Sequence, residues 1–336
     1  MSKPHILIAR AIDPQVMTFL EQHCEVRINK TDAVWSPAEL VGQLQGMDGV
    51  LTTGTERVDA ALLAACPQLK VVANMAVGYN NLDVHAMSAA GVQGTNAPDV
   101  LTETTADFGF ALLMATARRV TESEHYLRSG QWTKWSYDMF AGAEVHGSTL
   151  GVIGMGRIGQ GIAKRGAHGF GMEVVYHNRS RLSTTLEAEC KATYVSKEEL
   201  LRTADHVVLV LPYTQQNHHT IGAAELALMK PTATLINIAR GGIVDDAALA
   251  QALKARRIAA AGLDVFEGEP VVHPELLTVP NVVLTPHIAS ATVATRRAMG
   301  KLAADNLVAV LGGQDPLTPV NTPDASARAQ RWNTLF

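Results

Sequence analysis

The sequence predicts an α/β protein with two doubly wound parallel sheets, one in each of two domains. The 336 residues exceed the length of one typical domain and suffice for two buried cores. Along most of the chain, short apolar runs alternate with amphipathic helical patterns, which is typical of parallel sheets with helices on both faces. One long helical pattern over residues 101–129 interrupts this alternation and is expected to connect the two domains.

The first alternating series lies within residues 1–100. Its expected strands are His5–Arg10, Cys24–Ile28, Gly49–Thr52 and Lys70–Asn74. Helical patterns separate these strands, among them Pro14–Gln22 and Pro37–Gln45. Because a helix between two strands allows a crossover, we expect the strands to pair in parallel.

The interrupting pattern over residues 101–129 is expected to form a single helix, which Gly130 would end. A helix of this length between two domains also suggests a homodimer contact. Trp132 and Trp135 follow it, and their large aromatic side chains favour an interdomain or dimer surface over a stacking platform for a ligand.

The second alternating series predicts a sheet of six strands: Thr149–Ile153, Glu173–Tyr176, His206–Leu211, Ala233–Ile238, Ala259–Leu263 and Val282–Thr285. After it, Ser290 would cap a long helix over Ala291–Leu311, which could pack back on the first domain. We therefore expect a discontinuous first domain of residues 1–100 and 288–318, a second domain of residues 101–287, and a loosely held polar tail over residues 319–336.

The turn after the first strand of the second series carries three glycines in the pattern GxGxxG. An apolar strand leads into Gly154, Gly156 and Gly159, and an apolar helical pattern follows over Ile158–Ala167. Such glycines allow a tight turn, let the backbone approach a pyrophosphate at a helix N-terminus, and let helix pack on strand. The strand, turn and helix context favours a Rossmann dinucleotide-binding domain over an ordinary glycine-rich turn.

The end of the second strand of this domain bears on which dinucleotide binds. NAD-binding units of this type carry a carboxylate there, whereas this chain has His177 followed by Asn178, Arg179, Ser180 and Arg181. The missing acid removes a repulsion, and two guanidinium groups could bind a 2′-phosphate, so we expect NADP to be preferred. The alternative is a solvated turn in an enzyme that accepts NAD as well.

Three polar residues follow apolar strands of the second series and are candidates for catalysis. Arg240 follows the strand ending at Ile238, where the carboxyl end of a parallel strand opens toward a ligand, and it could bind a carboxylate. Glu269 and His287 each follow a later strand, and a glutamate commonly orients a histidine for acid/base work. A surface salt bridge of Arg240 and a structural role of His287 are the alternatives.

Composition excludes several functional classes. The net charge is −4 at pH 7, so the surface should repel nucleic acid, and no apolar run is long enough to cross a bilayer. The three cysteines form no CxxC pair, which favours reduced thiols in a soluble, cytoplasmic protein. His218 and His219 could be metal ligands by type, but we expect adjacent side chains in a polar loop to point apart, and we predict no metal.

Several motifs, in this order and spacing, resemble the D-2-hydroxyacid dehydrogenase family across essentially the whole chain: GMGRIG, INIARGGIVDDAAL, AAGLDVFEGEP and TPHIASAT. VGYNN, DVLTETTAD and HNRSR are most similar to the glyoxylate/hydroxypyruvate reductase branch and the related 2-ketogluconate reductases. The resemblance implies that the discontinuous domain is flavodoxin-like and binds substrate. It also implies that Arg240 and the Val77 and Gly78 amides bind substrate, and that His287 is the acid/base with Glu269 as its partner.

The residues expected to contact the cofactor, from the glycine turn, the second-strand loop and the resemblance together, are Thr105, Gly154, Met155, Gly156, Arg157, Ile158, Gly159, Asn178, Arg179, Ser180, Leu211, Pro212, Ile238, Ala239, Asp264 and Ser290. Within this set Asp264 is expected to accept a hydrogen bond from the nicotinamide carboxamide. The expected activity is NADPH-dependent reduction of small 2-oxo acids to D-2-hydroxy acids.

Three questions stay open. The chain also resembles phosphite dehydrogenase, but that enzyme carries a lysine where this chain has Val77, so the extra positive charge for a dianionic substrate is missing. Met139 stands where some hydroxypyruvate reductases place a tryptophan that enters the partner subunit's pocket, so the preferred size of substrate is open. Some co-repressors that sense dinucleotides also look like this family, and fold alone does not separate sensing from turnover.

Overall fold

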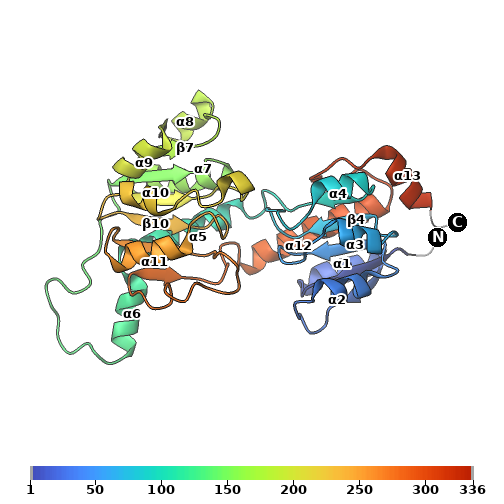
Figure 1. Ribbon diagram of the computed structural model, residues 1–336, viewed down its shortest axis with the longest axis horizontal. Helices are drawn as coiled ribbons and strands as arrows, with labels where there is room; N and C mark the ends of the chain where they lie inside the picture. The colour runs from blue at the N-terminus through green and yellow to red at the C-terminus, as the bar shows by residue number, and fades with distance from the viewer. Residues whose placement is uncertain (1–2, 334–336) are drawn as a thin grey trace. The chain divides into compact units, whose positions relative to one another are not determined.

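The computed structural model describes residues 3–333 and divides into two compact units. The first unit runs to Leu101 and resumes at Ala291, and the second unit is Thr102–Ser290. Each unit contains one parallel sheet with helices on both faces, so the predicted fold class is confirmed (Figure 1). Among the described residues, no helix combines the length and apolar character needed to cross a membrane.

The first unit is built on a five-stranded sheet in the order β2-β1-β3-β4-β5. Its strands are β1 His5–Ile8, β2 Glu25–Ile28, β3 Gly49–Thr52, β4 Val71–Asn74 and β5 Gln93–Thr95. Its helices are α1 Pro14–His23, α2 Pro37–Leu44, α3 Ala60–Ala65, α4 Val84–Ala89, α12 Val293–Leu311 and α13 Ala325–Asn333. Helix α12 packs on α1 and on the centre of the sheet, as predicted for the returning segment. The prediction missed β5, because Gln93 and Gly94 give it no apolar pattern.

The polar segment after residue 318 is not a loosely held tail. Val320 N donates to Gly94 O, and the Asn321 side chain accepts from Gly94 N. In helix α13, Arg331 donates to the main-chain carbonyl groups of Cys66 and Ala90. Polar side chains that bond to main-chain groups hold this segment on the sheet, and hydrophobic periodicity does not register such contacts. The last predicted tail residues, 334–336, lie outside the described part.

The second unit is built on a seven-stranded parallel sheet in the order β12-β11-β10-β9-β6-β7-β8. Its strands are β6 Thr149–Ile153, β7 Glu173–His177, β8 Ala192–Tyr194, β9 His206–Leu209, β10 Thr234–Asn237, β11 Ala260–Leu263 and β12 Val282–Leu284. The six predicted strands are all present, and β8 was missed because it is a short edge strand.

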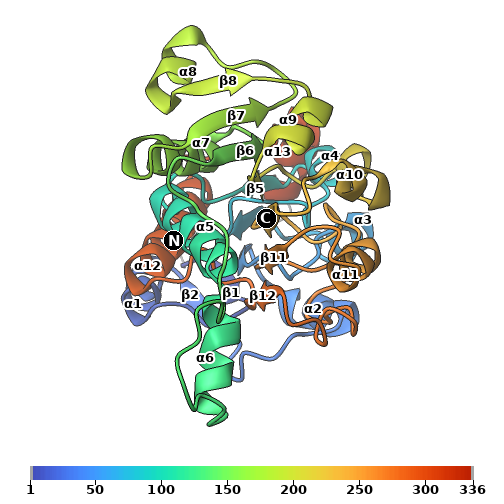
Figure 2. The same cartoon turned by 90° about the vertical axis from the view of Figure 1, so that its left-hand side faces the viewer.

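Helices cover both faces of the second sheet (Figure 2). The helices and short turns of this unit are α5 Thr102–Ala117, α6 Val120–Arg128, α7 Arg157–Lys164, the π-turn η1 Arg165–Gly169, α8 Thr184–Cys190, α9 Lys197–Thr203, the 3₁₀ turn η2 Gln215–Asn217, α10 Ala223–Leu228 and α11 Asp246–Lys254. Helices α5 and α7 share one apolar core with the sheet, and α9, α10 and α11 share the other. Burial of the sheet on both faces explains why the sequence of each of these strands is a nearly continuous run of apolar residues.

The prediction of a single helix over residues 101–129 is wrong. The chain forms α5 and α6 with a break at Arg119, whose backbone is left-handed with φ +54°. Ala143 N donates to Ala117 O, so a segment returning from the loop after α6 takes up the carbonyl at the end of α5. A Cβ on Gly142 would clash with the same oxygen, so glycine permits this approach. The break therefore depends on a segment well downstream of it, which local periodicity cannot detect.

The cap predicted for the last long helix is also wrong. Helix α12 begins at Val293, and Thr292 Oγ1 accepts from Thr295 N at 3.1 Å. Ser290 lies before this cap, at the end of the second unit. Both residues are good caps by type, and only the path of the chain selects Thr292.

Candidate active site

The predicted cofactor-binding and catalytic residues of the second unit gather at one edge of its sheet. Since all seven strands are parallel, their carboxyl ends lie at the same edge. Five neighbouring strands end there: β6 before the glycine turn, β9 before Leu211 and Pro212, β10 before Ile238 to Arg240, β11 before Asp264, and β12 before His287. The order of connection reverses between β6 and β9, which is where open α/β sheets bind ligands.

Each glycine of the turn after β6 has its own steric reason. Gly154 has φ +100°, and a Cβ there would lie 2.7 Å from Leu211 N. A Cβ on Gly159 would clash with Gly154 O, so this glycine lets α7 pack on the turn. A Cβ on Gly156 would meet no atom within 4 Å, which leaves open space above the turn. Gly154 and Gly159 are needed by the fold, and Gly156 leaves room for a ligand.

The N-terminus of α7 suits a phosphate group. Gly156 is its N-cap, and in the described chain no side chain caps its first amides. Arg157 and Ile158 are the first two residues of the helix, and Met155 is buried beneath the turn. Uncapped amides and the positive end of the helix dipole favour an anion at this position.

An orphaned hydroxyl on α5 is consistent with a polar ligand at the same helix pair. Thr105 is buried, and its Oγ1 atom has no hydrogen-bond partner within the described residues. Helix α5 packs directly on α7, where Gly161 approaches Ala106. Because an unsatisfied buried hydroxyl is costly, a bound ligand that supplies a partner would relieve this cost. The residues present therefore fit a dinucleotide.

The loop after β7 differs from its prediction in one respect. Arg181 does not stand free for a phosphate, because its guanidinium binds both oxygens of Glu187 at 2.8 and 2.9 Å. Tyr176 OH also donates to Glu187 at 2.7 Å, which fixes this carboxylate. Arg179 is exposed and has no hydrogen-bond or ion-pair partner in the part of the chain that the structure describes. Of the two predicted guanidinium groups, Arg179 alone is uncommitted.

Arg240 is held by its own backbone at the end of β10. Its Nη1 donates to Ala239 O at 2.8 Å, and Asn237 Nδ2 donates to Arg240 O at 3.4 Å. Burial lowers the pKa of the guanidinium, while the charge of Glu269 acts in the opposite direction. Arginine keeps its proton at any physiological pH, so Arg240 is a partly buried cation whose pKa the charge of Glu269 affects. A surface salt bridge does not describe it.

His287 and Glu269 form a direct hydrogen bond. Nδ1 of His287 lies 2.8 Å from Oε1 of Glu269, and Phe266 N donates to Oε2 at 3.4 Å. Burial works to raise the pKa of Glu269, but the hydrogen bond and charge of His287 outweigh it and hold this pKa below its usual range. With Nδ1 occupied, Nε2 is the ring nitrogen available to a substrate, since within residues 3–333 it has no partner. The predicted pair is present, and the charge of Arg240 also acts to lower the pKa of Glu269.

Asp264 has a function in this site that the sequence did not reveal. Its carboxylate accepts hydrogen bonds from Thr285 Oγ1 at 2.7 Å, Ile288 N at 2.8 Å and Ala289 N at 2.9 Å. These donors flank His287, whose backbone is left-handed with φ +55°, a costly conformation for a residue with a Cβ. Burial raises the pKa of Asp264, and the three donors counteract this effect. The buried carboxylate therefore holds the strained turn that presents His287.

Val77 and Gly78 belong to the first unit, where they follow β4. Asn96 Nδ2 donates to Val77 O at 2.8 Å, and Asn74 Nδ2 donates to Gly78 O at 3.1 Å. The two carbonyl groups are thus fixed, while neither amide N–H donates to any residue of the described chain. Such amides are free to bind an anion.

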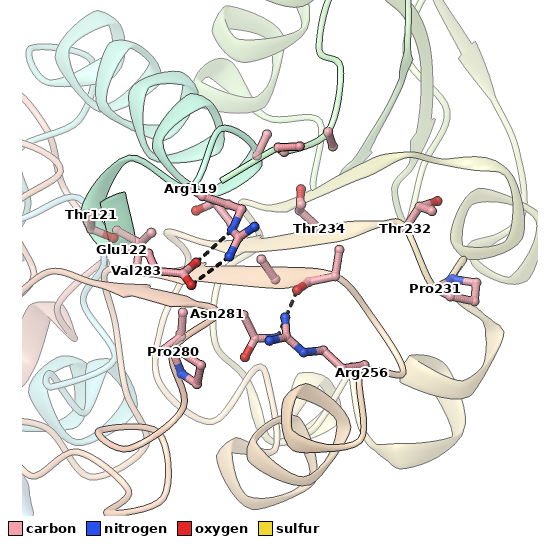
Figure 3. Close-up of a pocket in the computed structure, with 18 residues that line it drawn as sticks. Arg119, Thr121, Glu122, Pro231, Thr232, Thr234, Arg256, Pro280, Asn281 and Val283 are labelled. Carbon is pink, nitrogen blue, oxygen red and sulfur yellow. Dashed lines mark hydrogen bonds and ion pairs between the residues drawn. The ribbon is translucent and has the colours of Figure 1, made fainter. Parts of the chain in front are cut away.

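The opposite, amino edge of the second sheet contains a cavity of about 310 Å³ (Figure 3). Thr234, Ala260 and Val282, the first residues of β10, β11 and β12, line it together with Arg119 and Glu122. Arg119 forms two hydrogen bonds to Glu122 at 2.8 Å, as the sticks show. None of the predicted site residues lines this cavity.

His218 and His219 do not point apart as expected. Their rings stack with centroids 3.8 Å apart and an angle of 22° between the planes. His219 has φ +50°, and this left-handed backbone changes the direction in which its side chain leaves the chain. The expectation took no account of a left-handed residue in this loop.

The family model and the most similar sequences that were compared agree on one protein family. Residues 110–289 match the family described as D-isomer specific 2-hydroxyacid dehydrogenase, NAD binding domain. Glyoxylate reductase from Thermococcus onnurineus (strain NA1) is 47% identical over 323 residues, covering 95% of this chain and 96% of that protein. Glyoxylate reductase from Pyrococcus furiosus is 44% identical over 335 residues, covering 98% and 99%.

Solved structures agree with these sequence relatives. An NADPH-dependent glyoxylate/hydroxypyruvate reductase from Sinorhizobium meliloti, in complex with NADP and malonate, is 36% identical with a TM-score of 0.83 and covers 96% of this chain and 98% of that chain. The TT0316 protein from Thermus thermophilus is 39% identical with a TM-score of 0.87, covering 94% and 99%. The similarity therefore extends over both units.

Proposed function

Because this chain belongs to the D-isomer specific 2-hydroxyacid dehydrogenase family and is an NAD(P)-dependent reductase of 2-oxo acids, we propose that glyoxylate and hydroxypyruvate are its substrates. The products would be the corresponding 2-hydroxy acids, of D configuration where C2 is chiral. 2-Ketogluconate is a further candidate, since the accepted size of substrate depends on residues such as Met139. The names of the relatives support the two small substrates.

One observation carries the proposed roles: His287 and Glu269 are hydrogen-bonded at 2.8 Å, and the charge of the partly buried Arg240 helps to lower the pKa of Glu269. A positioned acid and a cation close together are what reduction of a ketone to an alkoxide and then an alcohol requires. The second ring nitrogen of His287 stays open, as donation of a proton to a substrate requires.

The proposed chemistry assigns one task to each of these side chains. A bound nicotinamide cofactor supplies the hydride. Arg240 binds the substrate and stabilises the negative charge that develops on the carbonyl oxygen. His287 delivers a proton to that oxygen from Nε2, so the product is a neutral hydroxyl group. Glu269 orients the ring through its hydrogen bond to Nδ1.

The amides of Val77 and Gly78 are proposed to hold the substrate carboxylate. Their fixed carbonyl groups and unpartnered N–H groups support this assignment. An aliphatic residue at Val77 adds no charge, which favours a monocarboxylate over phosphite. Replacement of Val77 by Lys is expected to change KM for glyoxylate only slightly, because the backbone amide of residue 77 that would bind the carboxylate is still present.

We propose that NADPH is preferred over NADH. The loop after β7 has His177 where a carboxylate would repel the 2′-phosphate, and Arg179 is the uncommitted guanidinium in that loop. The match to a reductase with bound NADP is consistent with this preference. Replacement of Arg179 by Gln is expected to raise KM for NADPH by about 10–100-fold, since a charge-assisted hydrogen bond contributes about 1.5–3 kcal/mol. KM for NADH should be unaffected, and the matched Arg181→Gln variant should leave the NADPH value near that of the wild type.

The central experiment follows absorbance of the reduced cofactor with purified protein. The panel contains glyoxylate, hydroxypyruvate, 2-ketogluconate and phosphite, the last with oxidised cofactor. Turnover of glyoxylate or hydroxypyruvate that is lost in the His287→Ala variant would support the proposal. Turnover of phosphite alone would assign the chain to the alternative substrate, and tight NADPH binding without turnover would indicate a dinucleotide sensor.

We propose that the enzyme is a homodimer that uses α6 and the segment after it. Every residue of α6 is at least partly exposed, and Trp132, Trp135 and Tyr137 of the following loop are exposed by 54%, 73% and 92%. This segment extends away from the rest of the second unit in Figure 1. Exposed aromatic side chains of this kind are typical of a protein interface. A Trp135→Ser/Tyr137→Ser double variant should have the mass of a monomer in size-exclusion chromatography with multi-angle light scattering. A dimer mass for this variant would contradict the proposed interface.

The cytoplasm is the proposed location. Cys24, Cys66 and Cys190 are free and buried, which suits a reducing compartment. Burial raises the pKa of the Cys24 thiol to about 11, so it is unreactive at neutral pH.

A further inference from the structure

A cluster of two histidines and a glutamate lies in the second unit, outside the residues assigned to the reaction. His218 and His219 follow η2, and Glu267 follows β11. Nε2 of His219 lies 2.9 Å from Oε2 of Glu267, and Nε2 of His218 lies 3.9 Å from Oε1 of the same carboxylate. One ligand atom from each of the three side chains lies within 4.8 Å of the others. Both Nε2 atoms therefore converge on one carboxylate.

The second ring nitrogen of each histidine has its own polar neighbour. Tyr213 OH lies 3.3 Å from Nδ1 of His218, and Oδ2 of Asp245 lies 3.8 Å from Nδ1 of His219. Histidines that bind metals commonly have a carboxylate or another polar group on the nitrogen that does not bind, because this group fixes the tautomer and the ring orientation. The cluster thus has an outer shell as well as three candidate ligands.

Two consecutive glycines bring the contributing loops into contact. A Cβ on Gly241 would clash with Phe266 O, next to Glu267. A Cβ on Gly242 would lie 3.0 Å from Tyr213 Cε2 and 3.3 Å from Nδ1 of His218. His219 N also donates to Gly242 O at 2.8 Å. The loops that carry the three side chains are therefore packed on one another.

We propose that His218, His219 and Glu267 bind a divalent transition-metal ion, with Zn²⁺ the best match. Two imidazole nitrogens and a carboxylate form a donor set that suits Zn²⁺, and three protein ligands leave a coordination position for water. The two histidine side chains are 34% exposed and the Glu267 side chain is 43% exposed, so an ion can reach them from solvent. The stacked rings would have to rotate apart on binding, so that the Nε2 lone pairs of both face the same ion.

This site is independent of the proposed reaction, since none of its three ligands has a task there. Asp245 caps helix α11 and Tyr213 belongs to the loop after β9, so both also have structural contacts. Failure of metal binding would leave the proposed reductase activity untouched, and failure of the activity would leave the metal site untouched.

Binding is tested on the full chain after treatment with a chelator, at neutral pH. ZnCl2 is titrated by calorimetry, and CoCl2 is titrated while visible absorption of the bound ion is recorded. We expect one equivalent of Zn²⁺ and a ligand-field spectrum of Co²⁺ typical of low coordination number. Both signals should be lost in His218→Asn/His219→Asn and in Glu267→Gln. Asn tolerates the left-handed backbone at position 219, and Gln keeps the shape of Glu267, so these variants should fold.

Two further kinds of variant separate a built site from adventitious binding. His125→Asn removes an exposed histidine on α6 and should leave both signals unchanged. Asp245→Asn and Tyr213→Phe remove outer-shell partners and should weaken Zn²⁺ binding by about 10–100-fold. Circular dichroism and thermal unfolding of each variant establish that the fold persists. An absence of binding by the wild type, or equal binding by the His218→Asn/His219→Asn variant, would overturn the proposal.

Discussion

The two edges of the second sheet use the same residue types in opposite ways. At the carboxyl edge, His287 is exposed, has one partnered nitrogen and sits on a left-handed backbone. At the amino edge, His206 begins β9, is fully buried, and has Thr234 Oγ1 at 2.8 Å from Nδ1 and Glu144 O at 3.0 Å from Nε2. Both are polar groups next to parallel strands, but only the first has a nitrogen available for a substrate.

The number of internal hydrogen-bond partners distinguishes the polar groups at the two edges. At the amino edge Asn281 donates to two carbonyl groups, and Asp205 accepts from Thr149 N and Lys230. At the carboxyl edge, no side chain of the described residues caps α7, and Nε2 of His287 has no partner among them. A polar group whose hydrogen bonds are all made within the protein contributes to stability, whereas one that lacks a partner is available to a ligand.

The largest difference in kcat should appear when the two histidines are replaced in separate variants. His287→Ala should lower kcat by about 10²–10⁴-fold, because it removes the positioned acid. The His206→Asn variant should keep kcat close to the wild-type value at a temperature where it is folded. Steady-state kinetics on both variants is the measurement. A normal kcat in His287→Ala would refute the proposed function of this residue.

The next largest effect, on kcat/KM, should come from replacing one arginine at each edge in separate variants. Arg240→Gln should lower kcat/KM for glyoxylate by about 10²–10³-fold, the usual loss when a donor to a developing oxyanion is removed. Arg256→Gln, at the cavity of the amino edge, should leave kcat/KM unchanged. If both variants lost activity equally, the assignment of the carboxyl edge as the reactive one would fail.

Stability should depend on pH through His206. Burial lowers the pKa of His206 below its usual value, so the folded state favours the neutral ring. The unfolded chain takes up a proton below a pH of about 6.5, so the contribution of His206 to stability is complete above that pH and is lost as pH falls toward the folded pKa. We expect Tm of the wild type to fall more steeply than that of His206→Asn between about pH 7.5 and pH 5.5. Parallel slopes in differential scanning calorimetry would contradict this.

The smallest expected effect concerns an ion pair at the amino edge. Lys230→Met removes the partner of Asp205, and both side chains are about one-third exposed, at 37% and 34%. The free energy of unfolding should fall by only about 0.2–1 kcal/mol, because solvent screens the pair. Chemical denaturation at low and high salt measures this difference, which should shrink at high salt. A loss of activity in this variant would show that the two edges are coupled.

The sequence indicated which residues form the glycine turn but not how the polar residues around it are paired. Gly154, Gly156 and Gly159 were recognised from their spacing, because local backbone geometry imposes that spacing. Arg181 was assigned to a phosphate because nothing in the sequence indicates its pairing with Glu187. The function of Asp264 in holding the His287 turn was missed because the donors lie 21 to 25 residues downstream.

The same division holds for the fold. The sequence alone determined the alternation of strands and helices, the parallel sheets and the glycine turn, because each depends on residues within one or two elements. Only the tertiary structure decided the break at Arg119, the cap at Thr292 and the stacking of His218 on His219. The break involves a hydrogen bond from the distant Ala143, whereas the cap and the stacked rings depend on backbone conformations that the residue types alone do not select.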